Sequence, residues 1–344
     1  MIRLLLVEDS VTQREILRRL IDASGDLVVV AEARNGREAV AGVARYRPDV
    51  VLMDIHMPDM DGVSATREIM QKTPVPIVIT SASLKRQEID LGMEALRAGA
   101  VSVIEKPQGA VLLHLGKIAP QLRNELIGAS KAKVVARPLR REPGIRSHAG
   151  ASARGGIEII GICASTGGPP VLMQILSGLP NPFPLPVLIV QHISPGFLQG
   201  FAKWLSNLSG QRVEQVRHRQ SLEPGFWLSE GHRHLCVDSN GRFNLVASRP
   251  GEIHCPSGNA LFQSLAEHYG ARAMGVLLTG MGDDGAEGLL ALRESGGRTI
   301  VQDEESSLIF GMPKAAAQRG AAQLQLPPVA IVDAIAGTVK PPQP

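Results

Sequence analysis

Residues 1–10 read MIRLLLVEDS, a short apolar run that ends in two acidic residues. A run of this length is typical of a buried strand, and it lacks the long apolar core and the cleavage site of a signal peptide. Similar runs occur at 27–31, 50–53, 77–80 and 101–104, and they alternate with amphipathic helical patterns at 11–24, 36–45, 61–71, 86–97 and 109–125. Five strand–helix units predict a (βα)5 domain over residues 1–125, with a parallel sheet covered by helices on both faces.

The length of 344 residues favours two domains. The net charge of +3 is concentrated in residues 126–156, which hold seven Lys and Arg and one acid, a local net charge of +6. Residues 1–125 have a net charge of −1 and residues 157–344 of −2, so we expect neither to bind nucleic acid. The middle segment is rich in Pro, Gly, Ser, Ala and Arg, which predicts a flexible basic linker; docking to an acidic partner is the alternative.

Cysteine content and apolar runs indicate the compartment. Three widely spaced cysteines (Cys163, Cys236 and Cys255) fit neither a disulfide framework nor a zinc site. There is no run of about 18 apolar residues, so we expect no transmembrane helix. These features favour a reduced, cytoplasmic protein.

Residues 157–344 return to an α/β pattern, which predicts a doubly wound domain. Strands are expected at 157–162, 187–190, 273–278 and 299–301, and helices at 168–177, 196–208, 257–269 and 284–295. Within 213–248, the turn sequences Glu223-Pro224-Gly225 and Ser239-Asn240-Gly241 predict antiparallel hairpins inserted into this domain.

Polar residues follow four strands of the first domain. Glu8 and Asp9 follow the first strand, Asp54 the third, Thr80 ends the fourth and Lys106 follows the fifth. All should meet at the carboxyl edge of the sheet, where Mg²⁺ would relieve the repulsion among the carboxylates. A carboxylate beside Mg²⁺ and a lysine can attack a phosphoryl group, and the threonine hydroxyl can bind its oxygens. The alternative is that each acid only caps a strand or helix.

A possible nucleophile lies in the second domain. Residues 161–170, GICASTGGPP, connect an apolar strand to a helix. Such a turn can expose the Ser165 hydroxyl and offer backbone N–H groups to an oxyanion. An ordinary glycine-rich turn is the alternative.

A base and an orienting acid are also present. Among the histidines, only His192 directly follows a strongly apolar strand, so it is the expected base for Ser165. Residues 278–286, LTGMGDDGA, offer Asp283 or Asp284 to orient that histidine, and local reasoning does not choose between them. Either acid can instead cap the next helix.

Residues 1–125 resemble a response-regulator receiver domain. The matching segments are Val7-Glu8-Asp9-Ser10, residues 53–62 (MDIHMPDMDG), Thr80-Ser81-Ala82 and Glu105-Lys106-Pro107. The resemblance implies that Asp54 is the phosphoacceptor, that Glu8, Asp9 and Asp54 bind Mg²⁺, and that Thr80 and Lys106 sense the phosphoryl group. Glu8 departs from the second Asp that many receivers have.

Residues 157–320 resemble the catalytic domain of CheB-type chemotaxis protein-glutamate methylesterases. The segments that match are Ser165-Thr166-Gly167-Gly168-Pro169, Gln191-His192, residues 278–286 and Phe310-Gly311-Met312-Pro313-Lys314, with weaker agreement at 254–257 and 302–307. The resemblance implies Ser165 as nucleophile, His192 as general base and acid, and Asp284, which precedes Gly-Ala, as the orienting carboxylate. It also implies that the Met281 N–H contributes to the oxyanion hole and that Thr166 lines the site.

Two departures accompany this resemblance. Cys163 stands where the family often has Gly, and we expect it to be buried and inert. The expected hairpin at 229–234 lacks the usual Ala-Pro-Gly, which bears on substrate specificity.

Together the two resemblances imply a phosphorylation-regulated enzyme that hydrolyses glutamyl methyl esters on methyl-accepting chemotaxis receptors and releases methanol. Deamidation of receptor glutamines is an implied second reaction. A chemotaxis histidine kinase would be the phosphodonor, and Mg²⁺ would serve the receiver while the esterase would need no cofactor. We expect a cytoplasmic monomer, with a methylesterase domain over 157–344, that meets the membrane only through its receptors. The receiver should block the esterase until Asp54 is phosphorylated. The alternatives are an adaptor with a vestigial esterase domain and a small-molecule esterase.

Overall fold

The computed structural model describes residues 1–339 except 24, 82–85, 107–114, 135–155, 250, 251 and 253. The chain divides into two compact units, Met1–Glu142 and Pro143–Pro344. Most of the predicted linker lies outside the described residues, as do Ala82 and Pro107 of the first-domain motifs. Among the described helices, none has the length and apolar character needed to span a bilayer.

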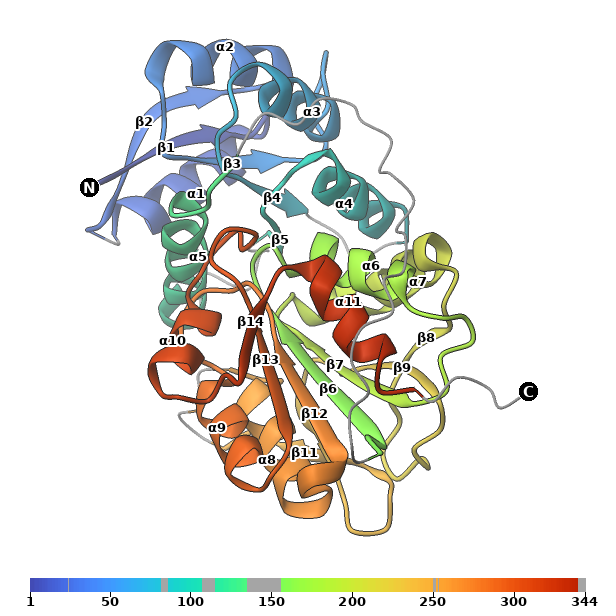
Figure 1. Ribbon diagram of the computed structural model, residues 1–344. Helices are drawn as coiled ribbons and strands as arrows, with labels where there is room; N and C mark the ends of the chain where they lie inside the picture. The colour runs from blue at the N-terminus through green and yellow to red at the C-terminus, as the bar shows by residue number, and fades with distance from the viewer. Residues whose placement is uncertain are drawn as a thin grey trace. The chain divides into compact units, whose positions relative to one another are not determined.

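The first unit is the predicted parallel (βα)5 fold. Its strands are β1 (Ile2–Val7), β2 (Leu27–Ala33), β3 (Val50–Asp54), β4 (Ile77–Ser81) and β5 (Ser102–Glu105), in the order β2-β1-β3-β4-β5. The helices are α1 (Val11–Asp22), α2 (Gly36–Tyr46), α3 (Gly62–Lys72), α4 (Arg86–Ala98) and α5 (Leu115–Ser130). Helix α1 contacts α5, whereas α2, α3 and α4 pack in succession against one another (Figure 1). Both faces of the sheet are therefore covered.

Helix α5 continues into the segment predicted as linker. It ends at Ser130, five residues beyond the predicted end of the last helix. Leu126 and Ala129 are fully buried, and the burial of these apolar side chains stabilises the additional helical residues.

The second unit contains a seven-stranded, all-parallel sheet, as expected for a doubly wound domain. Its order is β14-β13-β12-β6-β7-β9-β8. The strands are β6 (Ile159–Ala164), β7 (Pro186–Gln191), β8 (Val213–Gln215), β9 (Gly225–Leu228), β12 (Ala273–Leu277), β13 (Arg298–Gln302) and β14 (Leu324–Leu326). Helices α8 (Gly258–His268), α9 (Ala286–Glu294) and α10 (Met312–Gln318) form one layer, and α6 (Gly168–Gly178), α7 (Leu198–Ser209) and α11 (Pro328–Ala336) form the other (Figure 1).

Only one of the predicted hairpin turns joins antiparallel strands. Strands β10 (Arg233–Val237) and β11 (Phe243–Ala247) pair antiparallel around the predicted 239–241 turn. The expectation at 223–225 is wrong, because β9 pairs in parallel with both β7 and β8. Residues 226–228 of β9 are buried, which fits an interior strand of the main sheet rather than an exposed hairpin. Residues 229–232 accordingly connect β9 to β10 instead of forming a hairpin of their own.

Strand β6 lies where the strand order reverses. The chain runs outward from β6 through β7 to β9 and β8, and then returns to place β12, β13 and β14 on the other side of β6. Ligand sites in doubly wound sheets occur at the carboxyl edge beside such a reversal. Ser165, His192 and the 278–286 segment directly follow β6, β7 and β12, which are adjacent strands.

Candidate active site and phosphoacceptor site

Ser165 lies in a tight turn between β6 and α6. Its N–H donates to the Thr279 carbonyl at 3.0 Å, and its carbonyl accepts from the Gly168 N–H at 2.8 Å and Gln191 Nε2 at 2.9 Å. Gly167 has a φ of +78°, a left-handed conformation that glycine adopts without steric cost. The backbone at Ser165 is therefore fixed on both sides of the residue.

His192 and Asp284 form a direct side-chain pair. Nε2 of His192 lies 2.9 Å from Oδ2 of Asp284, whose side chain is only 2 % exposed. Asp283, the alternative acid, is 63 % exposed and pairs with Arg319 at 2.7 Å. Since the carboxylate takes Nε2, Nδ1 is the ring nitrogen that remains for proton exchange with a nucleophile. The geometry thus distinguishes Asp284 from Asp283, between which local sequence reasoning did not choose.

Asp284 receives hydrogen bonds from the start of α8 as well. Oδ1 accepts from Ser257 Oγ at 2.6 Å and the Asn259 N–H at 3.1 Å, and Oδ2 accepts from the Gly258 N–H at 2.6 Å. Burial alone would raise the pKa of Asp284, but the hydrogen bonds from His192, Ser257 and Gly258 outweigh it and hold the pKa well below its usual value. The carboxylate is therefore anionic and oriented.

Residues Ser257–Asn259 were not predicted as part of the site. The available signal was a serine placed to cap the helix predicted at 257–269, and Ser257 does cap α8.

His254, in the 254–257 segment of weaker family agreement, is a neighbour of His192. The two rings stack with centroids 5.1 Å apart and an interplanar angle of 11°. Burial, followed by the charge of His192, lowers the pKa of His254. A neutral ring here packs against His192 without electrostatic repulsion.

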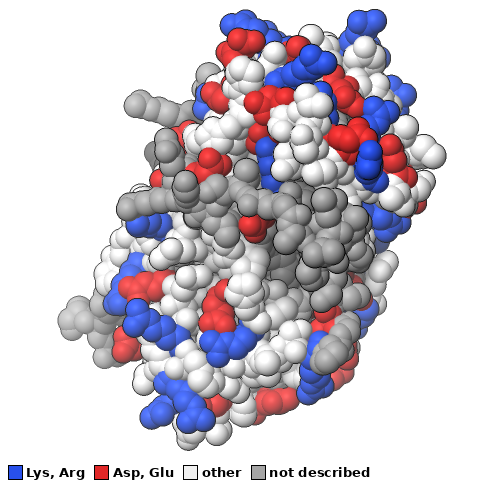
Figure 2. Space-filling view, turned by 180° about the vertical axis from the view of Figure 1, so that it is seen from behind, with Lys and Arg blue, Asp and Glu red and all other residues white. Residues whose placement is uncertain are grey.

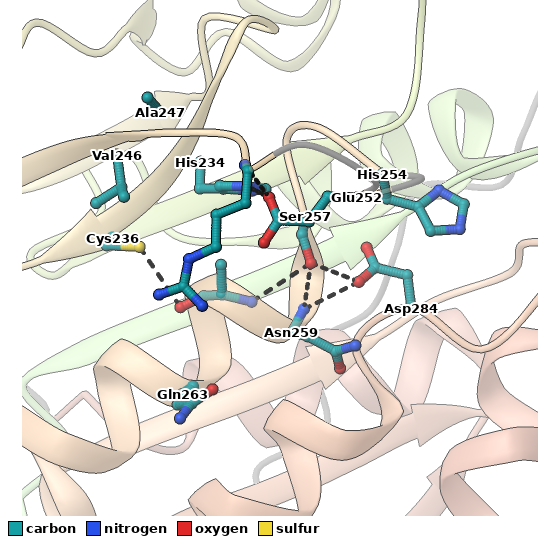
Figure 3. A pocket seen from close by; sticks show the side chains of 12 residues that line it. His234, Cys236, Val246, Ala247, Glu252, His254, Ser257, Asn259, Gln263 and Asp284 are labelled. Carbon is teal, nitrogen blue, oxygen red and sulfur yellow. Dashed lines mark hydrogen bonds and ion pairs between the residues drawn. The ribbon is translucent and has the colours of Figure 1, made fainter.

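A cavity of about 500 Å³ is bordered by Asp284 and His254. Figure 3 shows Asp284 and His254 at one side of it, Ser257 and Asn259 beside Asp284, and Cys236 of β10 and Gln263 of α8 farther from Asp284. Asp284 therefore contacts His192 on one side and lines the cavity on the other.

Thr166 and Met281 each offer a backbone N–H near the serine. In the part of the chain that the structure describes, neither N–H donates a hydrogen bond. Gly280 brings the Met281 segment close, since a Cβ at Gly280 would lie only 2.6 Å from Cβ of Ser165. These two N–H groups are suitable donors for an oxyanion.

Cys163 is fully buried, as expected, beneath the histidine–aspartate pair. Its Sγ lies within 4.8 Å of ligand atoms of His192 and Asp284. Burial raises the pKa of this thiol well above its usual value, so it is protonated and unreactive.

The first unit brings all five of its predicted site residues to one sheet edge. Lys106 Nζ lies 2.6 Å from Asp54 Oδ2 and 2.8 Å from Glu8 Oε2, and all three side chains are about 5 % exposed or less. Thr80 pairs in register with Asp54 across β3 and β4. Asp9 is exposed at the rim of the cluster.

The three carboxylates can hold a divalent cation. One oxygen from each of Glu8, Asp9 and Asp54 lies within 4.8 Å of the others. Burial raises the pKa of both Glu8 and Asp54 despite Lys106, so one lysine leaves the anionic charge incompletely compensated. Oxygen ligands with an exposed rim suit Mg²⁺, which retains several waters.

The described surface visible in Figure 2 carries both signs of charge. In Figure 2, Lys and Arg are interspersed with Asp and Glu over the visible described surface of each unit.

Comparisons with known proteins match both units of the chain. The CheB methylesterase family model matches residues 160–335, and the response regulator receiver domain model matches residues 4–115. A protein-glutamate methylesterase/protein-glutamine glutaminase of Methanospirillum hungatei is 40 % identical over 337 residues, covering 96 % of each chain. One from Geobacter metallireducens is 42 % identical over 342 residues, covering 97 % of this chain and 98 % of the relative. The crystal structure of the Thermotoga maritima CheB methylesterase catalytic domain is 34 % identical, with a TM-score of 0.51, and covers 54 % of this chain and all of that one.

Proposed function

This chain belongs to the CheB methylesterase family and includes a response-regulator receiver domain, and from this premise we propose that Ser165, His192 and Asp284 are its catalytic triad. The observation that supports the triad best is the 2.9 Å contact between His192 and the buried Asp284, at the ends of the strands that flank β6. The chain is a phosphorylation-regulated protein-glutamate methylesterase. It hydrolyses glutamyl methyl esters on chemotaxis receptors and deamidates receptor glutamines, and a histidine kinase supplies its phosphoryl group.

The proposed reaction begins with Ser165 Oγ attacking the ester carbonyl while Nδ1 of His192 takes its proton. The N–H groups of Thr166 and Met281 hold the oxyanion, and the charge of Asp284 stabilises the imidazolium. His192 then protonates the departing methanol, which leaves a glutamyl ester on Ser165. Water attacks that acyl-enzyme with His192 again as base, and glutamate and free Ser165 result. With a glutamine substrate, ammonia departs in place of methanol.

In the receiver we propose Asp54 as the phosphoacceptor. Glu8, Asp9 and Asp54 would hold Mg²⁺, which supplies charge neutralisation during phosphoryl transfer. Lys106 and Thr80 would bind phosphoryl oxygens, and Lys106 already contacts both Glu8 and Asp54. The esterase reaction uses no metal in this proposal.

The proposed organisation is a receiver over 1–125, a basic linker over 126–156 and a catalytic domain over 157–344. Unphosphorylated receiver would inhibit the esterase, and phosphorylation would shift that equilibrium. We propose a cytoplasmic monomer that reaches the membrane through its receptors.

Methanol release from methylated receptor membranes tests the proposal. Full-length protein is assayed with Mg²⁺, with and without a small acyl phosphate. We expect release in both conditions and faster release with the acyl phosphate, a stimulation that Asp54→Asn should abolish. No release at all would favour an adaptor, and hydrolysis of small esters without release from membranes would favour a small-molecule esterase.

A further inference from the structure

The parallel ladder between β6 and β12 ends at the nucleophile. Leu278 N–H donates to the Cys163 carbonyl at 2.9 Å, and Ser165 N–H donates to the Thr279 carbonyl at 3.0 Å. Beyond this rung the partners change, because the Ser165 carbonyl accepts from Gly168 and Gln191, and Gly280 N–H donates to the Ile309 carbonyl at 3.1 Å. Direct backbone hydrogen bonding between the two strands therefore ends at Ser165 and Thr279.

Past this point two N–H groups have no acceptor in the described structure, those of Thr166 and Met281. One lies in the segment that follows β6 and the other in the segment that follows β12. An oxyanion hole needs its donors about 2.7–3.1 Å from the developing charge, so the spacing of these two segments must be fixed.

The Thr279 side chain is fully buried and contacts the segment that follows β6. Its Oγ1 lies 3.1 Å from the Thr166 carbonyl and 3.2 Å from the Ile309 carbonyl, and it accepts from the Ile309 N–H at 2.9 Å. This hydroxyl thus connects the turn that holds Ser165 to the segment at Ile309, whose carbonyl also accepts from the Gly280 N–H.

The Thr279 backbone is held from the opposite direction by a second buried side chain, Gln302. Thr279 N–H donates to Gln302 Oε1 at 2.9 Å, and Gln302 Nε2 donates to the Ser306 carbonyl at 2.9 Å. Hydrogen bonds hold both the backbone N–H and the side-chain hydroxyl of Thr279, so the position of the hydroxyl is fixed.

We propose that Thr279 is a positioning residue of the esterase: its hydroxyl sets the spacing between the Thr166 and Met281 N–H groups and so aligns the oxyanion hole. This inference rests on the proposed function. The oxyanion forms only after Ser165 attacks, so misalignment should lower kcat and leave KM almost unchanged.

The test compares two threonines. Thr279→Val removes the hydroxyl with little change of shape, and we expect kcat to fall about 100-fold, the cost of misplacing a reacting or catalytic group by about 1 Å. Thr279→Ser should restore kcat to within a few-fold. Thr299→Val is the matched control, because Thr299 is also fully buried and its hydroxyl donates to the Ala321 carbonyl at 2.6 Å and accepts from the Gln323 N–H at 3.2 Å. Its kcat should stay within about twofold of wild type.

The assay measures methanol release by the full chain in the presence of acyl phosphate, and each rate is divided by the amount of folded protein. If Thr279→Val does not fold, Thr279→Ala is used in its place. A boronic acid that forms a tetrahedral adduct with serine provides a second readout, and its inhibition constant should rise with the loss in kcat. A hydroxyl-lacking variant at Thr279 whose kcat matches Thr299→Val, or whose defect is in KM, would overturn the inference. A wild-type chain that releases no methanol would instead overturn the proposed function.

Discussion

Replacement of Asp284 by Asn removes the charge of the triad acid and nearly preserves its shape. In the wild type, Oδ2 accepts from His192 and Gly258, and Oδ1 accepts from Ser257 and Asn259. An amide has one accepting oxygen. Whichever way it turns, the NH₂ group faces a backbone N–H, of either Gly258 or Asn259.

Both amide orientations should slow the reaction. If the oxygen faces His192, the imidazolium loses its counter-charge; if the NH₂ faces it, Nε2 must accept and Nδ1 holds the proton that it should take from Ser165. Charge removal at this position of a Ser-His-Asp triad costs about 10⁴ in kcat, roughly 5 kcal/mol at 1.36 kcal/mol per tenfold. Loss of one or two hydrogen bonds to a charged acceptor should lower the free energy of unfolding by about 3 kcal/mol.

The neighbouring exchange Asp283→Asn is the matched control. Its carboxylate is mostly exposed and pairs with Arg319, an arrangement worth under about 1 kcal/mol. We expect methanol release within about twofold of wild type and an unchanged urea midpoint. The triad assignment would be refuted if Asp283→Asn lost as much activity as Asp284→Asn, or if folded Asp284→Asn kept more than about a tenth of it.

Acid unfolding provides an independent readout of the same carboxylate. Despite burial, its hydrogen bonds lower the pKa of Asp284 in the folded state. Its contribution to stability is therefore full above the unfolded pKa of about 3.9 and is lost as the pH falls through the folded pKa. The stability of wild type should fall more steeply than that of Asp284→Asn between about pH 4 and pH 2; parallel curves would contradict the lowered pKa.

Three further predictions concern the close approach to the nucleophile, the metal and the receiver. Gly280→Ala places a Cβ 2.6 Å from Cβ of Ser165, so we expect at least about 100-fold slower methanol release with phosphorylation of Asp54 unaffected. Chelation of Mg²⁺ should abolish stimulation by acyl phosphate and leave basal release intact; loss of basal release would show that the esterase itself needs a metal. Deletion of residues 1–150 should raise basal release, and a truncated protein no faster than the unphosphorylated full chain would contradict inhibition by the receiver.

Much of both sites could be predicted because their residues follow apolar strands. Ser165 and His192 come directly after strand-like runs, and parallel strands bring such positions to one edge. The same reasoning brings Glu8, Asp54 and Lys106 to one edge, because βα alternation predicts parallel strands whatever their order in the sheet.

Other features depend on contacts between distant segments. Local reasoning did not choose between Asp283 and Asp284, although the family resemblance implied Asp284. In the structure the difference comes from Ser257 and its neighbours, which approach from another strand–helix connection and donate hydrogen bonds to the buried Asp284. The place of β9 in the main sheet also could not be predicted, because Pro-Gly before a short apolar run is common to hairpins and to interior strands. The role of Thr279 also depends on such contacts, because its hydroxyl joins the Thr166 carbonyl to the Ile309 segment.

The most direct test of the central claim is methanol release by Ser165→Ala from methylated receptor membranes, measured beside wild type with Mg²⁺ and acyl phosphate. The triad mechanism predicts that folded Ser165→Ala, still phosphorylated on Asp54, loses at least about 10³-fold of the wild-type rate. Unchanged release by this variant would contradict Ser165 as the nucleophile.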